Sequence, residues 1–313
     1  MKEYVLSYYS KFKCIAGACK HTCCAGWEMN IDKQSLENYL ADRSSFSSVL
    51  KSGINVKKSR FKADKSGRCA FLNDKGLCDI IINLGEECLC QVCRDHPRFR
   101  AFFSDRVETG LGFSCEEACK IILSFKDKIE PVLISDDGDE TALDFTEQNV
   151  VDFRKKALDI IQDRSLLIDD RISSLLKECK AEILDKDILK AIKRFLSFER
   201  VDKTFTKRLK NLKKVSINLH TGEDYALYAE QFLANALYRH LYDAEDTMWV
   251  RARTIACVIS WWIVKNIIES ETGENEPNFE LIVDIIRDFS TEVEYSQDNL
   301  DKLYDFAYKF IKI

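Results

Sequence analysis

Cysteine is the residue type in this sequence that could carry the most chemistry. Eleven of the thirteen cysteines lie between Cys14 and Cys119. They fall into four groups: Cys14, Cys19, Cys23 and Cys24; Cys69 and Cys78; Cys88, Cys90 and Cys93; and Cys115 and Cys119. So many thiols imply disulfides, a metal site or redox chemistry. The N-terminal sequence has no apolar signal segment, so we expect a cytoplasmic protein whose thiols stay reduced and bind metal.

The expected ligands are almost all sulfur, because only two histidines lie near these cysteines. Four thiolates suit either tetrahedral zinc or an iron–sulfur cluster. Zinc ribbons favour two C-x2-C pairs, and only Cys90 and Cys93 have that spacing. The wider spacings of the other cysteines fit a multi-iron cluster, or two neighbouring sites, better. Successive side chains diverge, so we expect Cys23 and Cys24 to serve different irons or different sites.

The usual catalytic signatures are missing from the sequence. Radical enzymes that use S-adenosylmethionine typically need C-x3-C-x2-C, but Gly26 and Ile122 stand where the third cysteine would follow the two C-x3-C pairs. A nucleotide-binding glycine loop is also missing, because Gly110-x-Gly112 has no third glycine. The sequence shows no clear Ser/His/Asp or Cys/His arrangement either.

Composition limits the partners that the protein could bind. The 313 residues are 46% hydrophobic and 32% charged, as in a globular protein, and carry a net charge of −5. A nucleic-acid-binding protein would usually have a strongly basic domain, so we expect no nucleic-acid partner. The most apolar run, residues 254–264, is about half as long as a bilayer-spanning helix. It predicts a buried core helix and no membrane association.

The sequence predicts a mainly α fold with two parts. Short elements and polar turns surround the cysteines, and this irregular metal-binding module is expected to occupy residues 1–130. An acidic, turn-rich link follows at residues 135–140, and an α-helical domain is expected over residues 141–313. Helices are predicted for residues 116–129, 145–161, 225–241, 249–268, 279–289 and 300–311, with a further helical pattern around Ile188. Metal ligation would supply folding energy that the small module otherwise lacks.

Several segments together resemble flagellin lysine-N-methylases. The resemblance is carried by FKCIAGACKHTCCAGWEMNID at residues 12–32, by CAFLNDKGLCDI at residues 69–80, and by Leu84-Gly85-Glu86. It continues at Cys93, at Pro97-Arg98 and at Ser114-Cys115-Glu116, and more weakly at YAEQFLANALYRH, residues 228–240. The first half also resembles a broader set of zinc- or iron-chelating cysteine-cluster proteins.

The resemblance implies which cysteines hold the metal. The family's cysteine positions are Cys14, Cys19, Cys23, Cys24, Cys69, Cys78, Cys93 and Cys115. The other three cysteines of this region, Cys88, Cys90 and Cys119, are expected to be buried or accessory. The family usually has Pro-Glu after its last cysteine, whereas this chain has Glu116-Glu117, so the local turn is expected to differ.

Two functions follow as hypotheses. The resemblance implies a protein-lysine N-methyltransferase that transfers methyl groups from S-adenosylmethionine to flagellin, with an iron–sulfur cluster, or alternatively zinc, bound by cysteines. The residues that bind the methyl donor or take the lysine proton are not identified by the sequence. The alternative is a non-catalytic metal-binding protein whose helical domain binds a partner.

Overall fold

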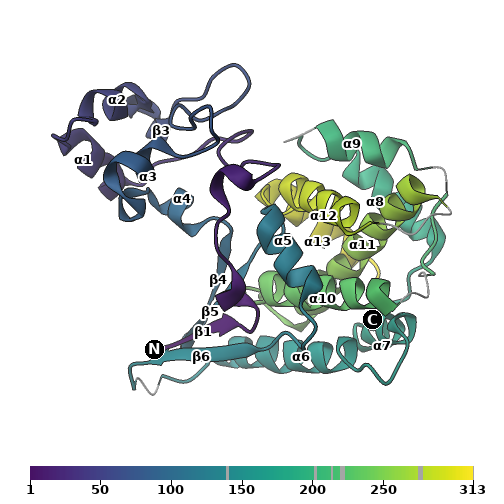
Figure 1. Ribbon diagram of the computed structural model, residues 1–313. Helices are drawn as coiled ribbons and strands as arrows, with labels where there is room; N and C mark the ends of the chain where they lie inside the picture. The colour runs from purple at the N-terminus through teal and green to yellow at the C-terminus, as the bar shows by residue number, and fades with distance from the viewer. Residues whose placement is uncertain (139–140, 201–202, 213, 219–222, 274–277, 313) are drawn as a thin grey trace. The chain divides into compact units, whose positions relative to one another are not determined.

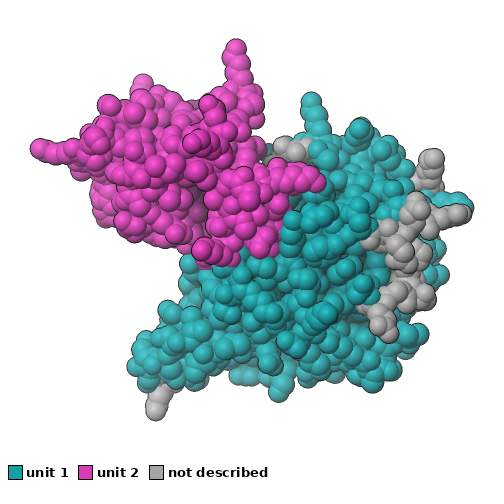
Figure 2. Space-filling view, viewed as in Figure 1, with its two compact units in different colours: residues 1–12, 99–114, 118–313 teal, residues 13–98, 115–117 magenta. Residues whose placement is uncertain are grey.

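The computed structural model describes residues 1–138, 141–200, 203–212, 214–218, 223–273 and 278–312 (Figure 1). The chain forms two compact units (Figure 2). The cysteine-rich unit comprises Lys13–Arg98 and Cys115–Glu117, and the helical unit comprises Met1–Phe12, Phe99–Ser114 and Ala118–Ile313. Residues 139 and 140 of the predicted acidic link lie outside the described residues.

A four-stranded sheet is part of the helical unit. Its strands are β1 (Lys2–Leu6), β4 (Arg98–Phe102), β5 (Arg106–Leu111) and β6 (Pro131–Asp136), in the order β4-β5-β1-β6. Strand β1 runs parallel to β5, with Lys2 opposite Arg106, and antiparallel to β6, with Leu6 opposite Pro131. A proline is tolerated at this position because it begins an edge strand. The sequence prediction had not identified this sheet.

The rest of the helical unit is α-helical, which confirms a mainly α fold. Its helices are α5 (Glu116–Ser124), α6 (Phe145–Ile161), α7 (Ile168–Glu178), α8 (Asp185–Phe195), α9 (Lys203–Lys210), α10 (Glu223–Leu241), α11 (Thr247–Thr272), α12 (Phe279–Val293) and α13 (Gln297–Tyr308). The predicted bounds of α6 are correct because a capping box fixes its start. The Asp144 carboxylate accepts the Glu147 N–H at 2.8 Å, and the Glu147 carboxylate accepts the Asp144 N–H at 3.1 Å.

Helix α11 forms the centre of the helical unit. Every residue from Thr254 to Ile268 is buried, so the helix is apolar on nearly all sides and must be enclosed by others. The Trp261 ring packs on Tyr225 and Phe232 of α10, with centroids 5.7 and 5.4 Å apart. The prediction of a core helix is therefore confirmed. In the described part of the chain, no helix has the length and apolar character needed to cross a bilayer.

The cysteine-rich unit consists of short elements joined by turns. They are α1 (Lys33–Ala41), α2 (Ser47–Ser52), β2 (Ile54–Asn55), β3 (Arg60–Phe61), α3 (Asp79–Leu84) and α4 (Gln91–Asp95). The unit also has a small apolar core, in which Phe61 meets Phe71 edge-to-face at 5.2 Å and Phe46 lies 6.2 Å from Phe71. Apolar packing therefore contributes to the fold of this unit alongside any bound metal.

The bounds of the two units differ from the predicted domains, residues 1–130 and 141–313. Residues 1–12, 99–114 and 118–130 belong to the helical unit, not to the cysteine-rich unit. The physical reason is the pairing of β1 with β5 and β6, which joins three segments that are distant in sequence. Most of the cysteine-rich unit is thus inserted in the chain between β1 and β4, and Cys115–Glu117 join it from beyond β5.

Candidate metal centre

Four thiols form what we call the outer thiol group: Cys14, Cys19, Cys23 and Cys115. Cys14 and Cys19 flank a single turn of 3-10 helix, Ala16–Ala18, and the Cys14 sulfur accepts the Ala16 N–H at 3.4 Å. Burial raises the pKa of Cys19 to about 12, and the negative charge of Cys115 adds to this effect. Cys115 and Cys14 also raise the pKa of Cys23, after its hydrogen bond with Cys24 and its burial. Cys14 and Cys115 therefore act in the same direction on the protonation of Cys19 and of Cys23.

Glu116 brings Cys115 to the loop that carries the other outer thiols. The His21 N–H donates to the Glu116 carboxylate at 2.8 Å, across 95 positions of sequence, and Glu116 is only 5% exposed. The Trp27 indole N–H donates to the Cys23 carbonyl at 2.7 Å and so fixes the other end of the loop. The sequence departs from the family pattern at Glu116-Glu117, and in this structure the first of these glutamates anchors the turn through the His21 N–H.

Five thiols form the inner thiol group: Cys24, Cys69, Cys78, Cys90 and Cys93. All of them belong to the apolar core of the cysteine-rich unit or pack against it. The Cys69 N–H donates to the Cys24 carbonyl at 2.9 Å, next to a second link from the Gly26 N–H to the Gly67 carbonyl at 3.1 Å. Gly26 has φ +89°, which a residue with a side chain adopts only with strain. The turn after Cys24 therefore depends on this glycine.

The remaining inner thiols stand at the starts of two short helices. Cys78 precedes α3 and Cys90 precedes α4. The Asp32 carboxylate caps α1 by accepting the Ser35 N–H at 2.9 Å. It also accepts the Gln91 N–H of α4 at 2.9 Å. The same side chain therefore holds α4 against α1. This contact sets the position of Cys90 and of Cys93 one turn later.

The inner thiols affect one another's protonation. Burial raises the pKa of Cys69 to about 11, and Cys24, Cys78 and Cys90 act in the same direction. Cys93 has a raised pKa because of its hydrogen bond with Cys90 and its burial. Cys24 differs, because a hydrogen bond from Cys23 and the nearby Arg68 charge lower its pKa to about 7. Cys90 also has a lowered pKa, because of its hydrogen bond with Cys93.

The chemistry of these donors fits a metal that prefers sulfur. Each group offers at least four thiols, the number that zinc or an iron–sulfur cluster uses. In the part of the chain that is described, no three His, Cys, Asp or Glu side chains are already arranged to hold a metal ion. Coordination would therefore need these side chains to rearrange, including the hydrogen-bonded pairs Cys23–Cys24 and Cys90–Cys93.

The eight cysteines that the family resemblance implied all lie in the cysteine-rich unit. Cys90, expected to be accessory, also belongs to the inner group, as its C-x2-C spacing to Cys93 could have indicated. Arg68 was not identified from the sequence, although it directly precedes Cys69. Cys88 donates to the Leu84 carbonyl at 3.2 Å. Cys119 is fully buried in the helical unit, as expected.

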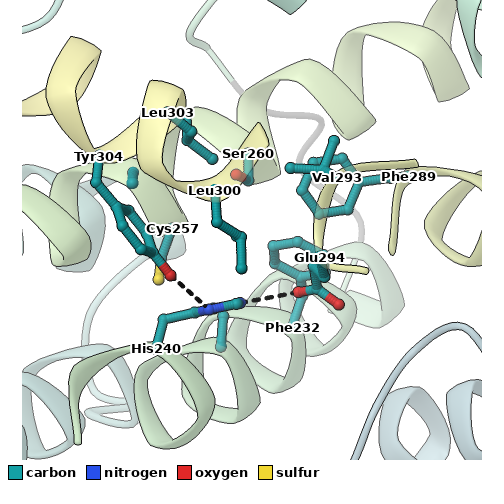
Figure 3. Close-up of a pocket in the computed structure, with 12 residues that line it drawn as sticks. Phe232, His240, Cys257, Ser260, Phe289, Val293, Glu294, Leu300, Leu303 and Tyr304 are labelled. Carbon is teal, nitrogen blue, oxygen red and sulfur yellow. Dashed lines mark hydrogen bonds and ion pairs between the residues drawn. The ribbon is translucent and has the colours of Figure 1, made fainter. Parts of the chain in front are cut away.

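A cavity in the helical unit contains a second cluster of titratable groups (Figure 3). His240 lies between Tyr304, whose hydroxyl is 2.8 Å from Nδ1, and Glu294, whose carboxylate is 2.9 Å from Nε2. Burial lowers the pKa of His240. Burial alone would raise the pKa of Glu294, but the Arg239 guanidinium at 3.0 Å and His240 outweigh it and lower the pKa to about 2. A neutral imidazole that donates from Nε2 satisfies both contacts.

The size of this cavity limits which molecules it could bind. The space open to the centre of a water molecule is about 10 Å³, which is about what one water needs. Its lining also includes Ser260 and is otherwise mostly apolar, with Phe232, Phe289 and Leu303. A cavity of this size does not admit a lysine side chain or a nucleoside, so we interpret the cluster as a buried polar network that supports the packing of α10, α12 and α13.

Comparison with known proteins confirms the resemblance to lysine-N-methylases. Proteins named Lysine-N-methylase from Salmonella typhimurium and Salmonella choleraesuis are each 28% identical to this chain over 138 residues, which is 41% of this chain and 34% of theirs. The Flagellar biosynthetic protein FliU of Salmonella muenchen is 27% identical over 138 residues, 41% of this chain and 82% of that protein.

The similarity is partial. The chain matches about a third of the length of the two lysine-N-methylases. No family model matches the sequence. No solved structure matches it either.

Proposed function

We propose that this protein is a protein-lysine N-methyltransferase that uses S-adenosylmethionine to methylate flagellin. The observation that carries this proposal is the similarity to two proteins named Lysine-N-methylase and to one named Flagellar biosynthetic protein FliU. The many thiols of the cysteine-rich unit support a metal centre as part of the same protein. A net charge of −5 and the proposed reducing surroundings of the thiols favour a cytoplasmic enzyme that acts on protein instead of nucleic acid.

The proposed reaction is a polar displacement. The lysine nitrogen attacks the methyl carbon of the sulfonium, an N–C bond forms, and the S–C bond breaks with its electron pair going to sulfur. The products are methyl-lysine, S-adenosylhomocysteine and one proton, which passes to a base or to water. An unperturbed lysine has a pKa near ~10.4, so the enzyme must desolvate the ammonium or remove its proton before attack.

The metal would stabilise the fold that presents the substrate site. Cys14, Cys19, Cys23, Cys24, Cys69, Cys78, Cys93 and Cys115 are the proposed ligands, for an iron–sulfur cluster in preference to zinc. When bound, the metal supplies strong thiolate bonds, and methyl transfer from a sulfonium requires no electron donor. The residues of this chain position it: Asp32 joins α1 to α4, and Glu116 holds the loop before Cys23.

A methyl-transfer assay tests this proposal. Protein purified without oxygen is incubated with flagellin and labelled S-adenosylmethionine, and the flagellin peptides are analysed by mass spectrometry. We expect methyl-sized mass increases on lysine side chains without any added reductant. Folded, metal-containing protein that leaves flagellin unlabelled would contradict the enzymatic proposal, and a strict need for a low-potential reductant would contradict the structural role of the metal.

The alternative is a metal-binding interaction protein without catalytic activity. One observation on the sequence favours it: Gly110-x-Gly112 lacks the third glycine of a nucleotide-binding loop. In that case the helical unit would bind a partner protein. Binding of S-adenosylmethionine to the purified protein, measured by calorimetry, separates the two proposals, because only the enzyme needs the donor.

A further inference from the structure

We propose that a basic surface of the cysteine-rich unit binds an acidic segment of a partner protein. This surface, the basic hairpin, is formed by residues 49–68, which run from the middle of α2 through β2 and β3 to the turn before Cys69 (Figure 1). None of the proposed metal ligands lies in this segment. Binding to it requires no methyl transfer and is separate from the proposed enzymatic reaction.

Positive charge dominates the basic hairpin. The segment contains seven basic side chains and a single acidic one, Asp64. The whole chain carries a net charge of −5, so this concentration of positive charge is a local feature of one part of the surface. A local charge of one sign attracts the opposite charge on a partner and raises the rate at which the two meet.

The strand pairing places two lysines at the tip of the hairpin. Asn55 of β2 pairs with Arg60 of β3, and the chain turns between them. The Asn55 side chain accepts the Lys58 N–H at 3.2 Å and so holds the turn. Lys57 and Lys58 follow one another in this turn, and both are exposed.

Backbone contacts bring two more lysines together at the end of α2. The Lys62 N–H donates to the Gly53 carbonyl, and its ammonium donates to the Ser52 carbonyl, both at 2.7 Å. The ammonium of Lys51, the residue before Ser52, donates to the Asp42 carbonyl at 2.9 Å. These carbonyls orient the two ammonium groups but do not neutralise their charge.

Most of the positive charge has no counter-charge within the protein. The Asp64 carboxylate is used by its own turn, where it accepts the Ser66 N–H at 2.7 Å and the Arg68 N–H at 3.1 Å. Arg60 forms an ion pair with Glu28. Within the described ranges, no carboxylate lies at ion-pair distance from the lysines of the segment, which are Lys51, Lys57, Lys58, Lys62 and Lys65.

The side chains of the basic hairpin fit an acidic protein segment better than a nucleic acid or a membrane. Single-stranded nucleic acids stack on exposed aromatic rings, whereas Phe61, the aromatic residue of this segment, is buried. Binding in a membrane surface uses large apolar side chains such as Trp, Phe and Leu, whereas the exposed apolar residues here are Val49 and Val56. Lysines with small apolar neighbours suit Asp and Glu side chains on a protein.

Peptide binding to the whole protein tests the proposal. A fluorescent oligoglutamate peptide is titrated with the protein at low and at high salt, with an oligoglutamine peptide as the neutral comparison. We expect only oligoglutamate to bind, with an affinity that falls as salt screens the exposed charges. A DNA duplex and vesicles of phosphatidylserine and phosphatidylcholine are titrated in the same way and should bind more weakly.

Two double variants locate the binding. Lys57→Glu combined with Lys58→Glu reverses the charge at the tip, and we expect it to weaken oligoglutamate binding roughly tenfold. Lys126→Glu combined with Lys128→Glu is the matched control. These two lysines of the helical unit are also exposed and close in sequence, have no ion-pair partner among the described residues, and change the net charge equally. The control should bind oligoglutamate like the unmodified protein.

Several results would overturn the proposal. Equal weakening by the two double variants would show that net charge controls binding, and unchanged binding by the folded tip variant would place the site elsewhere. If the tip variant does not fold, Lys65→Glu in the turn after β3 serves for the same measurement. Tighter binding of DNA or vesicles than of oligoglutamate would exclude the protein partner, and binding of none of the three would leave a solvated surface. A negative methylation assay would leave the proposal intact.

Discussion

Glu116 is a single residue whose side chain joins distant parts of the cysteine-rich unit. Replacing it with alanine removes the acceptor of the partly buried His21 N–H, and the loss of such a hydrogen bond costs about 0.5–1.5 kcal/mol. We expect Glu116→Ala to speed hydrogen exchange at His21 and to weaken metal retention by the outer thiols. Glu116→Gln keeps an acceptor oxygen and should be close to the unmodified protein. Equal effects of both substitutions would show that the negative charge matters more than the hydrogen bond.

Glu294 makes the stability of the helical unit depend on pH. Its folded pKa of about 2 lies below its ordinary value of 4.5, so its contribution is complete above about pH 4.5 and disappears as the pH falls towards 2. We expect the free energy of unfolding to decrease across that window. Urea titrations followed by tryptophan fluorescence can measure this, because three of the four tryptophans, Trp249, Trp261 and Trp262, lie in the helical unit.

The variant Glu294→Gln provides the control for this pH dependence. It removes the titrating group, so the decrease between pH 4.5 and 2 should become smaller. At neutral pH it leaves Arg239 buried without its ion-pair partner, which costs about 3–5 kcal/mol. An unchanged acid profile in a folded variant would assign the pH dependence to other groups.

At the scale of elements, the capping box at the start of α6 allows a direct test of how much one helix cap contributes to stability. Asp144→Ala removes the side chain that accepts the Glu147 N–H and should lower the free energy of unfolding by about 1 kcal/mol. Thermal unfolding followed by circular dichroism measures this change. Asp152→Ala, in the middle of the same helix, is the control and should have little effect, because its partner Gln148 is exposed.

The helices were predictable from sequence to the extent that their signals are local. The capping box defined α6 to the residue, and the apolar run at residues 254–264 indicated the buried centre of α11. Strand β1 could not be predicted in the same way, because its partners β5 and β6 lie more than a hundred residues away. The predicted boundary after residue 130 differed from the observed units for the same reason.

The residues of the candidate metal centre could likewise be predicted from sequence only in part. Residue type and spacing indicated a thiol-rich metal module, and the adjacency of Cys23 and Cys24 indicated different partners for the two. The membership of each group depends on turns such as that at Gly26 and on the Glu116 contact, which bring distant segments together. Cys90 was set apart from the ligands by family resemblance, although its side chain is in hydrogen-bond contact with Cys93.

At the scale of the whole molecule, the two units should respond differently to metal removal. If thiolate ligation supports the cysteine-rich unit, chelation should increase hydrogen exchange over residues 13–98. Helices α6, α10 and α11 should keep their protection, because their core consists of packed side chains. Hydrogen exchange with mass spectrometry on the intact protein, with and without chelator, measures both. Uniform loss of protection would show that the units unfold together.

The insertion of the cysteine-rich unit between β1 and β4 has a consequence for biosynthesis. Lys2 pairs with Arg106, and Leu6 pairs with Pro131, so a ribosome must make more than a hundred further residues before β1 can find its neighbours. During that interval nine of the ten thiols of the cysteine-rich unit emerge before β5, and Cys115 follows β5. If these thiols bind metal as proposed, the nascent chain would meet it while its first strand is still unpaired, and early metal delivery would then protect against misfolding.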